Sequence, residues 1–199
     1  IASMILGAVA AIGQNNIKRL IAYSSIGHMG YAIAGVASGT ENGFESALTY
    51  ILIYTVMNIG IFSFVFLMKR KGKYIEEISE LSGASKNHPL ISLALLIILF
   101  SLAGIPPLAG FFAKFYIFMA VIESGMYTLA IVGLVTTVVS AFYYIRIIKI
   151  MYFDDSKKPF DSFKNYEIHT SLTLSCIFLA SFFLYPSIFH TIISNISIF

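Results

Sequence analysis

The sequence predicts an all-α fold: a polytopic bundle of transmembrane helices in which one helix is discontinuous. Three observations lead to this prediction. The 199-residue chain is 58% hydrophobic, with a mean hydropathy of +0.84 and 12% charged residues, whereas a typical soluble domain has about 25% charged residues. Its charges are separated by long apolar stretches. One stretch is interrupted by a Gly-Ile-Pro-Pro sequence, 104–107, which is followed by a single lysine, Lys114.

The apolar stretches set the number of helices. No Asp, Glu, Lys or Arg occurs in five stretches of 21 to 32 residues: 20–40, 46–68, 87–113, 124–145 and 168–199. A membrane-spanning helix needs roughly 17–25 mostly apolar residues, so each stretch is long enough. Turn-forming residues lie between them, and the pattern predicts helices near 19–38, 44–68, 89–122, 126–151 and 168–195. A soluble all-α core would not leave 32 uncharged residues at one end of the chain.

The first residues, about 1–13, predict a partial helix. This run is apolar, has no initiator methionine and has no basic flank, so it is typical neither of a signal peptide nor of a natural N-terminus. We therefore expect residues 1–199 to be the C-terminal part of a longer membrane domain. This part would contain about five and a half transmembrane helices and a long loop over 69–88.

The basic residues are sorted to one side of the predicted bundle. Counted alternately, the first, third and fifth connections share a side and hold 12 of the 13 basic residues: Lys18, Arg19, Lys69, Arg70, Lys71, Lys73, Lys86, Arg146, Lys149, Lys157, Lys158 and Lys164. The other connections carry Glu41, Glu45 and Glu123 but no Lys or Arg. The positive-inside rule places the basic loops, including 69–88, in the cytoplasm and the C-terminus on the opposite side. The thirteenth basic residue is Lys114.

The segment from Pro89 to Ile122 is too long for one straight span. Its 34 residues would form a helix about 51 Å long, against a hydrocarbon core of about 30 Å. Pro106 and Pro107 remove two backbone donors, and Gly104 and Gly110 supply permissive backbone on both sides. We predict two half-helices, 89–103 and 108–122, joined near mid-membrane. Irregular backbone at that depth is typical of the ion and substrate sites of transporters.

Lys114 lies about two turns beyond this break. A lysine near the bilayer centre costs about 2.5–3.5 kcal/mol on insertion scales. Burial disfavours its charged form and a nearby carboxylate favours it, so a lysine balanced between the two can exchange a proton near neutral pH. Carbonyls 101–103 would add negative potential if the half-helices face each other. We predict that Lys114 is a proton carrier; the alternative is a kinked packing helix whose lysine pairs statically.

A second polar group is predicted on the helix over 19–38. Ser24, His28 and Tyr31 are spaced i, i+4 and i+7 and share a face. A histidine that titrates near neutrality is a natural proton carrier, which makes His28 a candidate proton relay. The alternative is a hydrogen bond across a tight, glycine-rich helix contact. Lys18, at the basic end, is expected to be a topology determinant and lipid anchor, with a relay role as the alternative.

Two polar stripes and one loop segment complete the pattern. One stripe is formed by Tyr50, Tyr54 and Asn58, and the other by Thr136, Thr137, Ser140 and Tyr144. We expect ordinary interhelical hydrogen bonds from both stripes, with the ordering of water beside Lys114 as the alternative. In the loop, Ile75, Ile78 and Leu81 share a helical face, which predicts a short segment along the membrane surface.

The sequence predicts no metal or cofactor site in this chain. None of His88, His169 and His190 has a second histidine or a carboxylate at metal-ligand spacing on one face. The lone cysteine, Cys176, excludes a disulfide framework, and phosphate-binding glycine loops and CxxC pairs are absent. The basic run 69–73 borders a span and precedes three glutamates, so it is a cytoplasmic flank rather than a nucleic-acid-binding patch.

Three motifs carry a resemblance to a known family. They are NNIKRLIAYSSIGHMGY (15–31), YTVMNIGIFSF (54–64) and SLAGIPPLAGFFAKFY (101–116). In order and spacing they resemble the antiporter-like proton-pumping subunits of NADH:quinone oxidoreductase (complex I), and within that group most of all the C-terminal end of subunit N. The resemblance runs over essentially the whole chain. Related subunits of multisubunit Na+/H+ antiporters and membrane-bound hydrogenases share these motifs.

The resemblance implies a respiratory subunit of the bacterial inner (plasma) membrane that moves protons together with other membrane-arm subunits. Lys114 matches the family's lysine on the second broken helix, at the exit end of the proton path. NADH, FMN, iron–sulfur clusters and quinone are then expected in partner subunits, and no cofactor in this chain. Two alternatives stay open: a subunit of a Na+/H+ antiporter or membrane-bound hydrogenase, and a purely structural bundle beside an active neighbour.

Overall fold

The structure, a computed structural model, describes residues 1–161 and 165–184. Its helices are α1 (Ala2–Ile12), α2 (Ile17–Ala37), α3 (Glu41–Leu67), α4 (Ala84–Asn87), α5 (Pro89–Ala103), α6 (Ala109–Glu123), α7 (Tyr127–Phe153) and α8 (Tyr166–Ser181). Two 3-10 turns, η1 (Ile78–Leu81) and η2 (Phe182–Leu184), and a small hairpin of β1 (Lys69–Arg70) and β2 (Lys73–Tyr74) complete the described part. The chain is therefore an all-α bundle, as predicted.

The predicted spans are confirmed over the described residues. Helices α2, α3 and α7, and α8 together with η2, are long and apolar enough to cross a membrane. The predicted discontinuous helix is present as α5 and α6, each of 15 residues, with the link 104–108 between them. Residues 185–195 of the last predicted helix, His190, Lys164 and the predicted far-side C-terminus lie outside the described residues.

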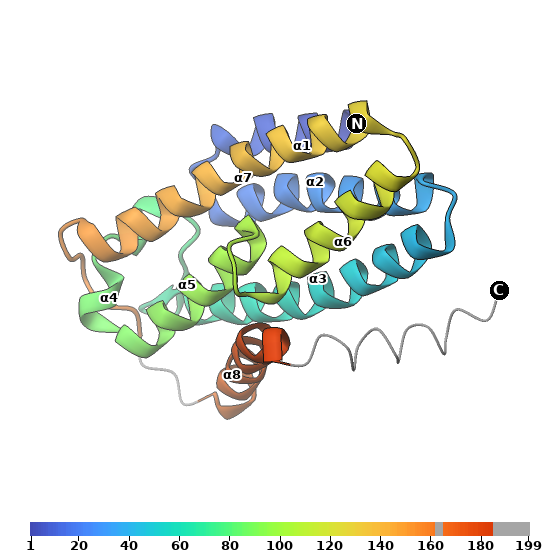
Figure 1. Cartoon of the computed structure of the whole chain (residues 1–199). Coiled ribbons are helices and arrows are strands. Elements are labelled where there is room, and N and C mark those ends of the chain that lie inside the picture. The colour runs from blue at the N-terminus through green and yellow to red at the C-terminus, as the bar shows by residue number, and fades with distance from the viewer. Residues whose placement is uncertain (162–164, 185–199) are drawn as a thin grey trace.

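The broken helix runs through the middle of the bundle (Figure 1). Half-helix α5 packs against α3, α7 and α8, and half-helix α6 packs against α2, α3 and α7. Helix α1 lies on the outside, against α2 and α7. The two half-helices that flank the link are thus packed against other helices of the bundle.

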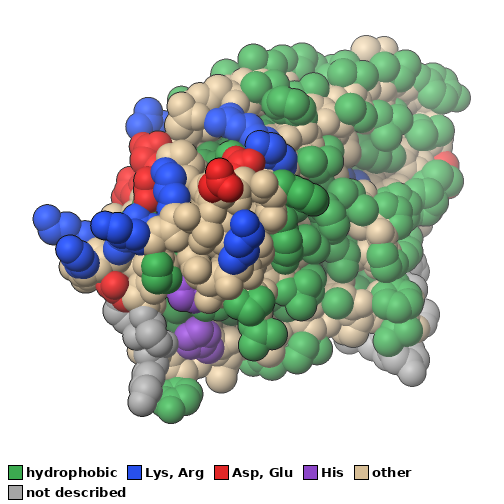
Figure 2. All heavy atoms as spheres, turned by 90° about the vertical axis from the view of Figure 1, so that its left-hand side faces the viewer, with side chains coloured by type: hydrophobic (Ala, Val, Ile, Leu, Met, Phe, Trp, Pro, Cys, Tyr) green, Lys and Arg blue, Asp and Glu red, His purple; other side chains and the backbone are tan. Residues whose placement is uncertain are grey.

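The first, third and fifth connections meet at one end of the bundle, as the sorting of charges predicted. Backbone hydrogen bonds join the first to the third (Ile17 N to Glu76 O, 2.7 Å) and the third to the fifth (Asp161 N to Lys69 O, 2.8 Å). Figure 2 shows Lys, Arg, Asp and Glu side chains gathered together there, with hydrophobic side chains covering the neighbouring surface.

The prediction for the loop segment 74–81 was wrong. Instead of one amphipathic helical segment, the chain forms the hairpin β1–β2, a bridge between Asn16 and Glu77, and the turn η1. Ile78 and Leu81 do share an environment, but they are buried in the protein core rather than laid on the membrane. The physical reason is that η1 packs against α7, which buries their apolar surface more fully than lipid headgroups would.

Candidate functional site

Half-helix α5 ends in a glycine turn whose N–H groups bond to only some of the last carbonyls of the helix. Gly104 adopts the left-handed conformation (φ 83°), which a glycine reaches without strain. Its N–H donates to Ser101 O (3.0 Å), and the Ile105 N–H donates to Phe100 O (3.0 Å). This is a Schellman ending, and it satisfies two of the four carbonyls that a helix C-terminus leaves without partners. The carbonyls of Leu102 and Ala103 remain.

Lys114 satisfies the two remaining carbonyls. Its Nζ donates to Leu102 O (3.0 Å) and to Ala103 O (3.3 Å). These carbonyls carry the negative end of the α5 dipole, so the amine lies where positive charge is favoured. The sequence predicted negative potential from carbonyls 101–103 if the half-helices face each other, and two of these three carbonyls contact the amine. Gly104 also leaves room for the lysine, because a methyl group added there would meet its Cδ at 3.1 Å.

The second half-helix is capped in return. Ser101 Oγ on α5 accepts the N–H of Gly110 (3.0 Å), one of the donors that the first turn of α6 leaves free. Gly110 allows this approach, because a Cβ at this position would overlap the Ser101 carbonyl. Each half-helix thus supplies the polar group that the other half's terminus lacks. This pairing holds the break closed inside the apolar bundle.

No carboxylate contacts Lys114 within the described residues. The lysine side chain is 4% exposed. All ten Asp and Glu residues are described, and none of them is buried. The remaining neighbour of the amine is the Tyr31 ring, whose centroid is 5.2 Å from Nζ, within the range of a cation–π interaction. A buried amine surrounded by two carbonyls and an aromatic face can hold a proton without being locked into an ion pair.

His28 is the centre of a hydrogen-bonded group beside Lys114. It is 2% exposed. Its Nδ1 pairs with Tyr50 OH (2.6 Å) and its Nε2 with Tyr144 OH (3.1 Å), and Tyr144 OH also pairs with Ser24 Oγ. The ring stacks on Tyr54, with centroids 4.8 Å apart.

A neutral imidazole donates from one nitrogen and accepts at the other, so it donates to one tyrosine while accepting from the other. Exchange of the tautomer reverses both bonds, and such a chain of hydroxyls can pass a proton along. The predicted shared face of Ser24, His28 and Tyr31 is confirmed by their common burial. The predicted interhelical bonds from Tyr50, Tyr144 and the threonines are also present.

The comparison with known families agrees with this architecture. The family described as "NADH:quinone oxidoreductase/Mrp antiporter, TM" matches residues 1–140. The chain belongs to this family. The resemblance predicted from the three motifs is therefore confirmed, and the break and Lys114 both fall within the matched residues.

Individual relatives of this family member cover it almost completely. It is 60% identical over 198 residues to NADH-quinone oxidoreductase subunit N of Pelagibacter ubique (strain HTCC1062). The matched region covers all of this chain and 42% of that protein. A chain of respiratory complex I from Thermus thermophilus, solved with bound Aureothin, matches it with a TM-score of 0.78 and 29% identity, over 96% of this chain and 43% of that one.

A chain of the membrane-bound sulfane sulfur reductase, an archaeal respiratory membrane complex, is similar too. It matches with a TM-score of 0.86 and 26% identity, over 98% of this chain and 39% of that one. The chain thus spans less than half the length of the proteins it matches. The shared architecture occurs in complexes whose names state different redox reactions.

Lys18 lies apart from the buried group of this family member. Its Nζ pairs with Glu76 Oε1 (2.7 Å), and both side chains are more than 40% exposed. It is ten residues before His28 on α2, about 15 Å along the helix axis. The structure therefore brings His28 and Lys114 near each other but leaves Lys18 at the charged end.

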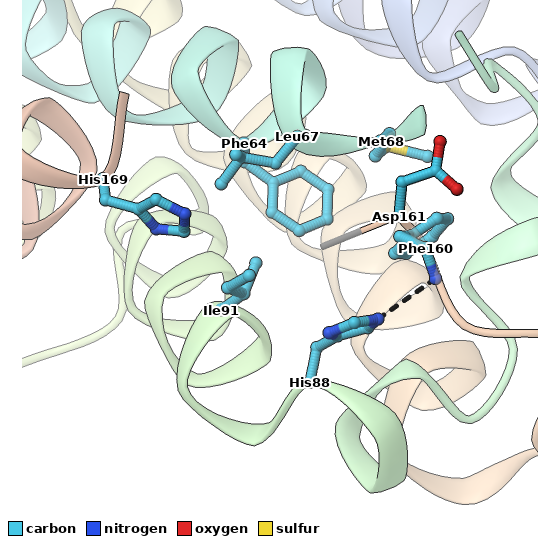
Figure 3. Close-up of a pocket in the computed structure, with 8 residues that line it drawn as sticks. All are labelled: Phe64, Leu67, Met68, His88, Ile91, Phe160, Asp161 and His169. Atoms are coloured by element: carbon cyan, nitrogen blue, oxygen red, sulfur yellow. Dashed lines mark hydrogen bonds between the residues drawn. The ribbon is translucent and has the colours of Figure 1, made fainter. Parts of the chain in front are cut away.

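A small pocket at the charged end is lined by five apolar side chains together with His88, Asp161 and His169. The pocket, about 90 Å³ in volume, lies between the end of α3, the start of α5 and the start of α8 (Figure 3). His88 Nε2 accepts the Phe160 N–H (3.0 Å), and the Asp161 carboxylate accepts the N–H groups of Lys71 and Gly72. In the described ranges, no three His, Cys, Asp or Glu side chains are placed to hold a metal ion. These hydrogen bonds attach residues 160–161 to the start of α5 and to the turn of the β1–β2 hairpin.

Proposed function

We propose that this chain is the C-terminal part of subunit N of a bacterial NADH:quinone oxidoreductase, and that it moves protons across the inner membrane. The observation that carries the proposal is the position of Lys114, a buried amine held at a helix break by uncharged groups alone. The 60% identity to a subunit N along the whole chain supports the same assignment.

The proposed surroundings follow from this assignment. Other membrane-arm subunits are the partners, and they would complete a proton path of which this chain holds the Lys114 and His28 part. NADH, FMN, iron–sulfur clusters and quinone belong to those partners, and no redox centre is needed in this chain. We place the basic connections in the cytoplasm and the C-terminus on the opposite side, following the positive-inside rule.

Lys114 is the proton carrier in this proposal. When it is protonated, its three N–H donors are stabilised by Leu102 O, Ala103 O and the Tyr31 face. When it is neutral, the carbonyls still receive hydrogen bonds from the amine. Both forms are therefore tolerated, and the proton can leave without breaking an ion pair. His28 and its tyrosine partners form the neighbouring relay.

The test uses two substitutions in the full-length protein within the intact complex. Lys114→Met removes the proton-binding group and Lys114→Arg keeps a charge that cannot be released, because arginine is not deprotonated in proteins. We expect both variants to lose at least about 10-fold in proton pumping per electron transferred. Pumping is followed in membrane vesicles during NADH oxidation, and complex assembly is checked in parallel.

Lys149→Met is the matched control, because this lysine is 63% exposed and pairs with Asp154. It should pump normally. Normal pumping by an assembled Lys114→Met variant would rule out the proposed carrier. Full recovery in Lys114→Arg alone would show that a fixed charge suffices, which favours a purely structural role.

The second candidate function is a cation/proton antiporter subunit, since the family description includes the Mrp antiporter. A Na+ site needs several oxygen ligands, and the free carbonyls at a helix break are the usual source. Here Leu102 O and Ala103 O are already bonded to the lysine amine. Protons are therefore the favoured cargo. Pumping that stops when Na+ is withdrawn, or co-purification without redox subunits, would favour the antiporter instead.

A further inference from the structure

Tyr31 neighbours both basic side chains of the buried group, Lys114 and His28. Its side chain is 2% exposed. The ring centroid lies 5.2 Å from Lys114 Nζ on one side and 6.1 Å from the His28 ring, nearly edge-on at 75°, on another. Phe118 and Tyr50 pack against the same ring, each at 6.1 Å. Tyr31 is thus an aromatic side chain that lies beside both the amine and the imidazole.

The Tyr31 ring lies next to the buried amine of Lys114, where a charged lysine inside a membrane would usually have a carboxylate partner. Away from their ends, the helices packed against α6 carry the titratable side chains of Tyr23, His28 and Tyr31 on α2, Tyr50 and Tyr54 on α3, Tyr143 and Tyr144 on α7, and Cys176 on α8. Over the described ranges, the charged residues of these helices stand near the helix ends, apart from Lys114 itself. An aromatic face attracts a cation through its quadrupole, most strongly when water is excluded.

The hydroxyl group of Tyr31 has a different task. It pairs with Thr136 Oγ1 and Thr137 Oγ1 on α7, both at 3.1 Å. The hydroxyls of Thr136 and Thr137 also donate to backbone carbonyls of their own helix, so the phenol proton is directed toward this pair of threonines. The hydroxyl is directed away from proton exchange with the lysine, and it fixes the orientation of the ring.

We propose that Tyr31 is a positioning residue that stabilises the protonated form of Lys114 through the face of its ring. The threonines of α7 hold that face toward the amine. This inference rests on the proposed function, in which Lys114 gains and loses a proton. It predicts that the ring determines the pH range in which pumping operates, whereas the hydroxyl contributes only orientation.

The test compares Tyr31→Phe with Tyr31→Leu in the full-length protein within the complex, using the pH profile of proton pumping. Tyr31→Leu removes the aromatic face, so the alkaline limb of the profile should move to lower pH by about one unit. Tyr31→Phe keeps the face and should move the limb by less than about one third of that. Phe118→Leu is the matched control, because it removes a ring that touches Tyr31 and should leave the limb in place.

A second variant keeps the test decisive if the leucine variant does not assemble. Trifluorophenylalanine at position 31 has nearly the shape of phenylalanine but a weaker negative face. It should shift the alkaline limb in the same direction as leucine. An unshifted limb in this variant, or an equal loss in Tyr31→Phe, would overturn the inference.

The two proposals fail in different ways. If Lys114→Met pumps normally, the proposed function fails and Tyr31 has no proton to stabilise. If Lys114→Met loses pumping but the Tyr31→Leu and trifluorophenylalanine profiles match the wild type, only the inference about Tyr31 fails.

Discussion

The middle of the bundle and its charged end hold their cations in different ways. At the charged end, Glu80 accepts hydrogen bonds from Arg70 (2.6 Å) and from Lys157 (2.8 Å). In the middle, Lys114 is held by two carbonyls and a ring, with no carboxylate among the described residues. The first arrangement keeps the charges permanently in place, because a carboxylate favours the charged form of its partner. The second arrangement contains no carboxylate, among the described residues, that would fix the charge of the amine.

This difference teaches what each region is built for. The ion pairs of the end join three connections that are far apart in the sequence, and they lie partly in water, where each contributes little energy. In the middle, the amine of Lys114 caps the carbonyl end of α5, and Ser101 of α5 caps the first turn of α6. Ion pairs therefore connect the loops at one end of the bundle, while uncharged groups contact the buried lysine in the apolar middle.

The largest expected effect comes from opening the break itself. Gly110→Ala places a methyl group on the Ser101 carbonyl, so the two caps cannot form together. We expect a loss of about 3 kcal/mol of stability, since overpacking of this kind typically costs about 1–3 kcal/mol. The measurement is the amount of assembled complex in membranes and its thermal denaturation.

Gly13→Ala is the matched control, because nothing lies within 4 Å of a Cβ at that position. It should assemble like the wild type. A Gly110→Ala variant with wild-type stability would show that the reciprocal caps are not what holds the two half-helices together.

The second prediction compares two histidines. His28→Gln keeps hydrogen-bonding capacity between Tyr50 and Tyr144 but cannot titrate, so proton pumping should fall at least about 10-fold while assembly is retained. His88→Gln at the charged end should pump normally, since the described contacts of the His88 ring are with Phe160, whose N–H it accepts and on whose ring it stacks. Pumping per electron in vesicles measures both. Equal pumping by the two variants would remove His28 from the proton path.

Much of the middle could be predicted from the sequence, because its determinants are local. Two prolines between two glycines, in a segment too long for one span, predict the break without any knowledge of neighbours. The spacing of Ser24, His28 and Tyr31 predicts a shared face in the same way. The hydrogen-bond partners of these residues could not be predicted from the sequence. Lys114 meets carbonyls 11 and 12 residues away, and His28 meets tyrosines 22 and 116 residues away.

The charged end was predicted less well, for a related reason. Its composition showed which connections share a side, but the hairpin and the Glu80 pairs depend on contacts between distant loops. Glu80 and Lys157 are 77 residues apart. The spacing of Ile75, Ile78 and Leu81 suits a helix, yet the tertiary contact of η1 with α7 decides the conformation. Ser101, which caps α6, carried no sequence pattern that distinguishes it from other serines.

A smaller effect is expected at Glu80. Hydrogen bonds from Lys157 and Arg70 lower the pKa of this carboxyl below its ordinary value of 4.5. Its contribution is therefore complete above pH 4.5 and is lost as the pH falls through the lowered value. Glu80→Gln should reduce stability by about 1 kcal/mol at pH 7, without changing pumping per electron.

Thermal denaturation of the complex at several pH values tests the Glu80→Gln prediction. The difference in stability between the variant and the wild type should shrink below pH 4.5. High salt should shrink it as well, because it screens partly exposed pairs. A difference that stays constant from pH 7 to pH 3 would show that the ion pairs are not its cause.

The smallest effect is expected at Lys18, where both candidate roles can be separated. Its hydrogen bond is the main cause that lowers the pKa of the Glu76 carboxyl, followed by that from Asn16. Lys18→Ala should let this pKa rise toward its usual value. The stability difference between the variant and the wild type should therefore be present above pH 4.5 and should disappear below it. The pair is exposed, so the loss should be smaller than for Glu80→Gln, and pumping should be unchanged. A clear loss of pumping with normal assembly would instead make Lys18 a relay and extend the proton path from the buried middle to the charged end.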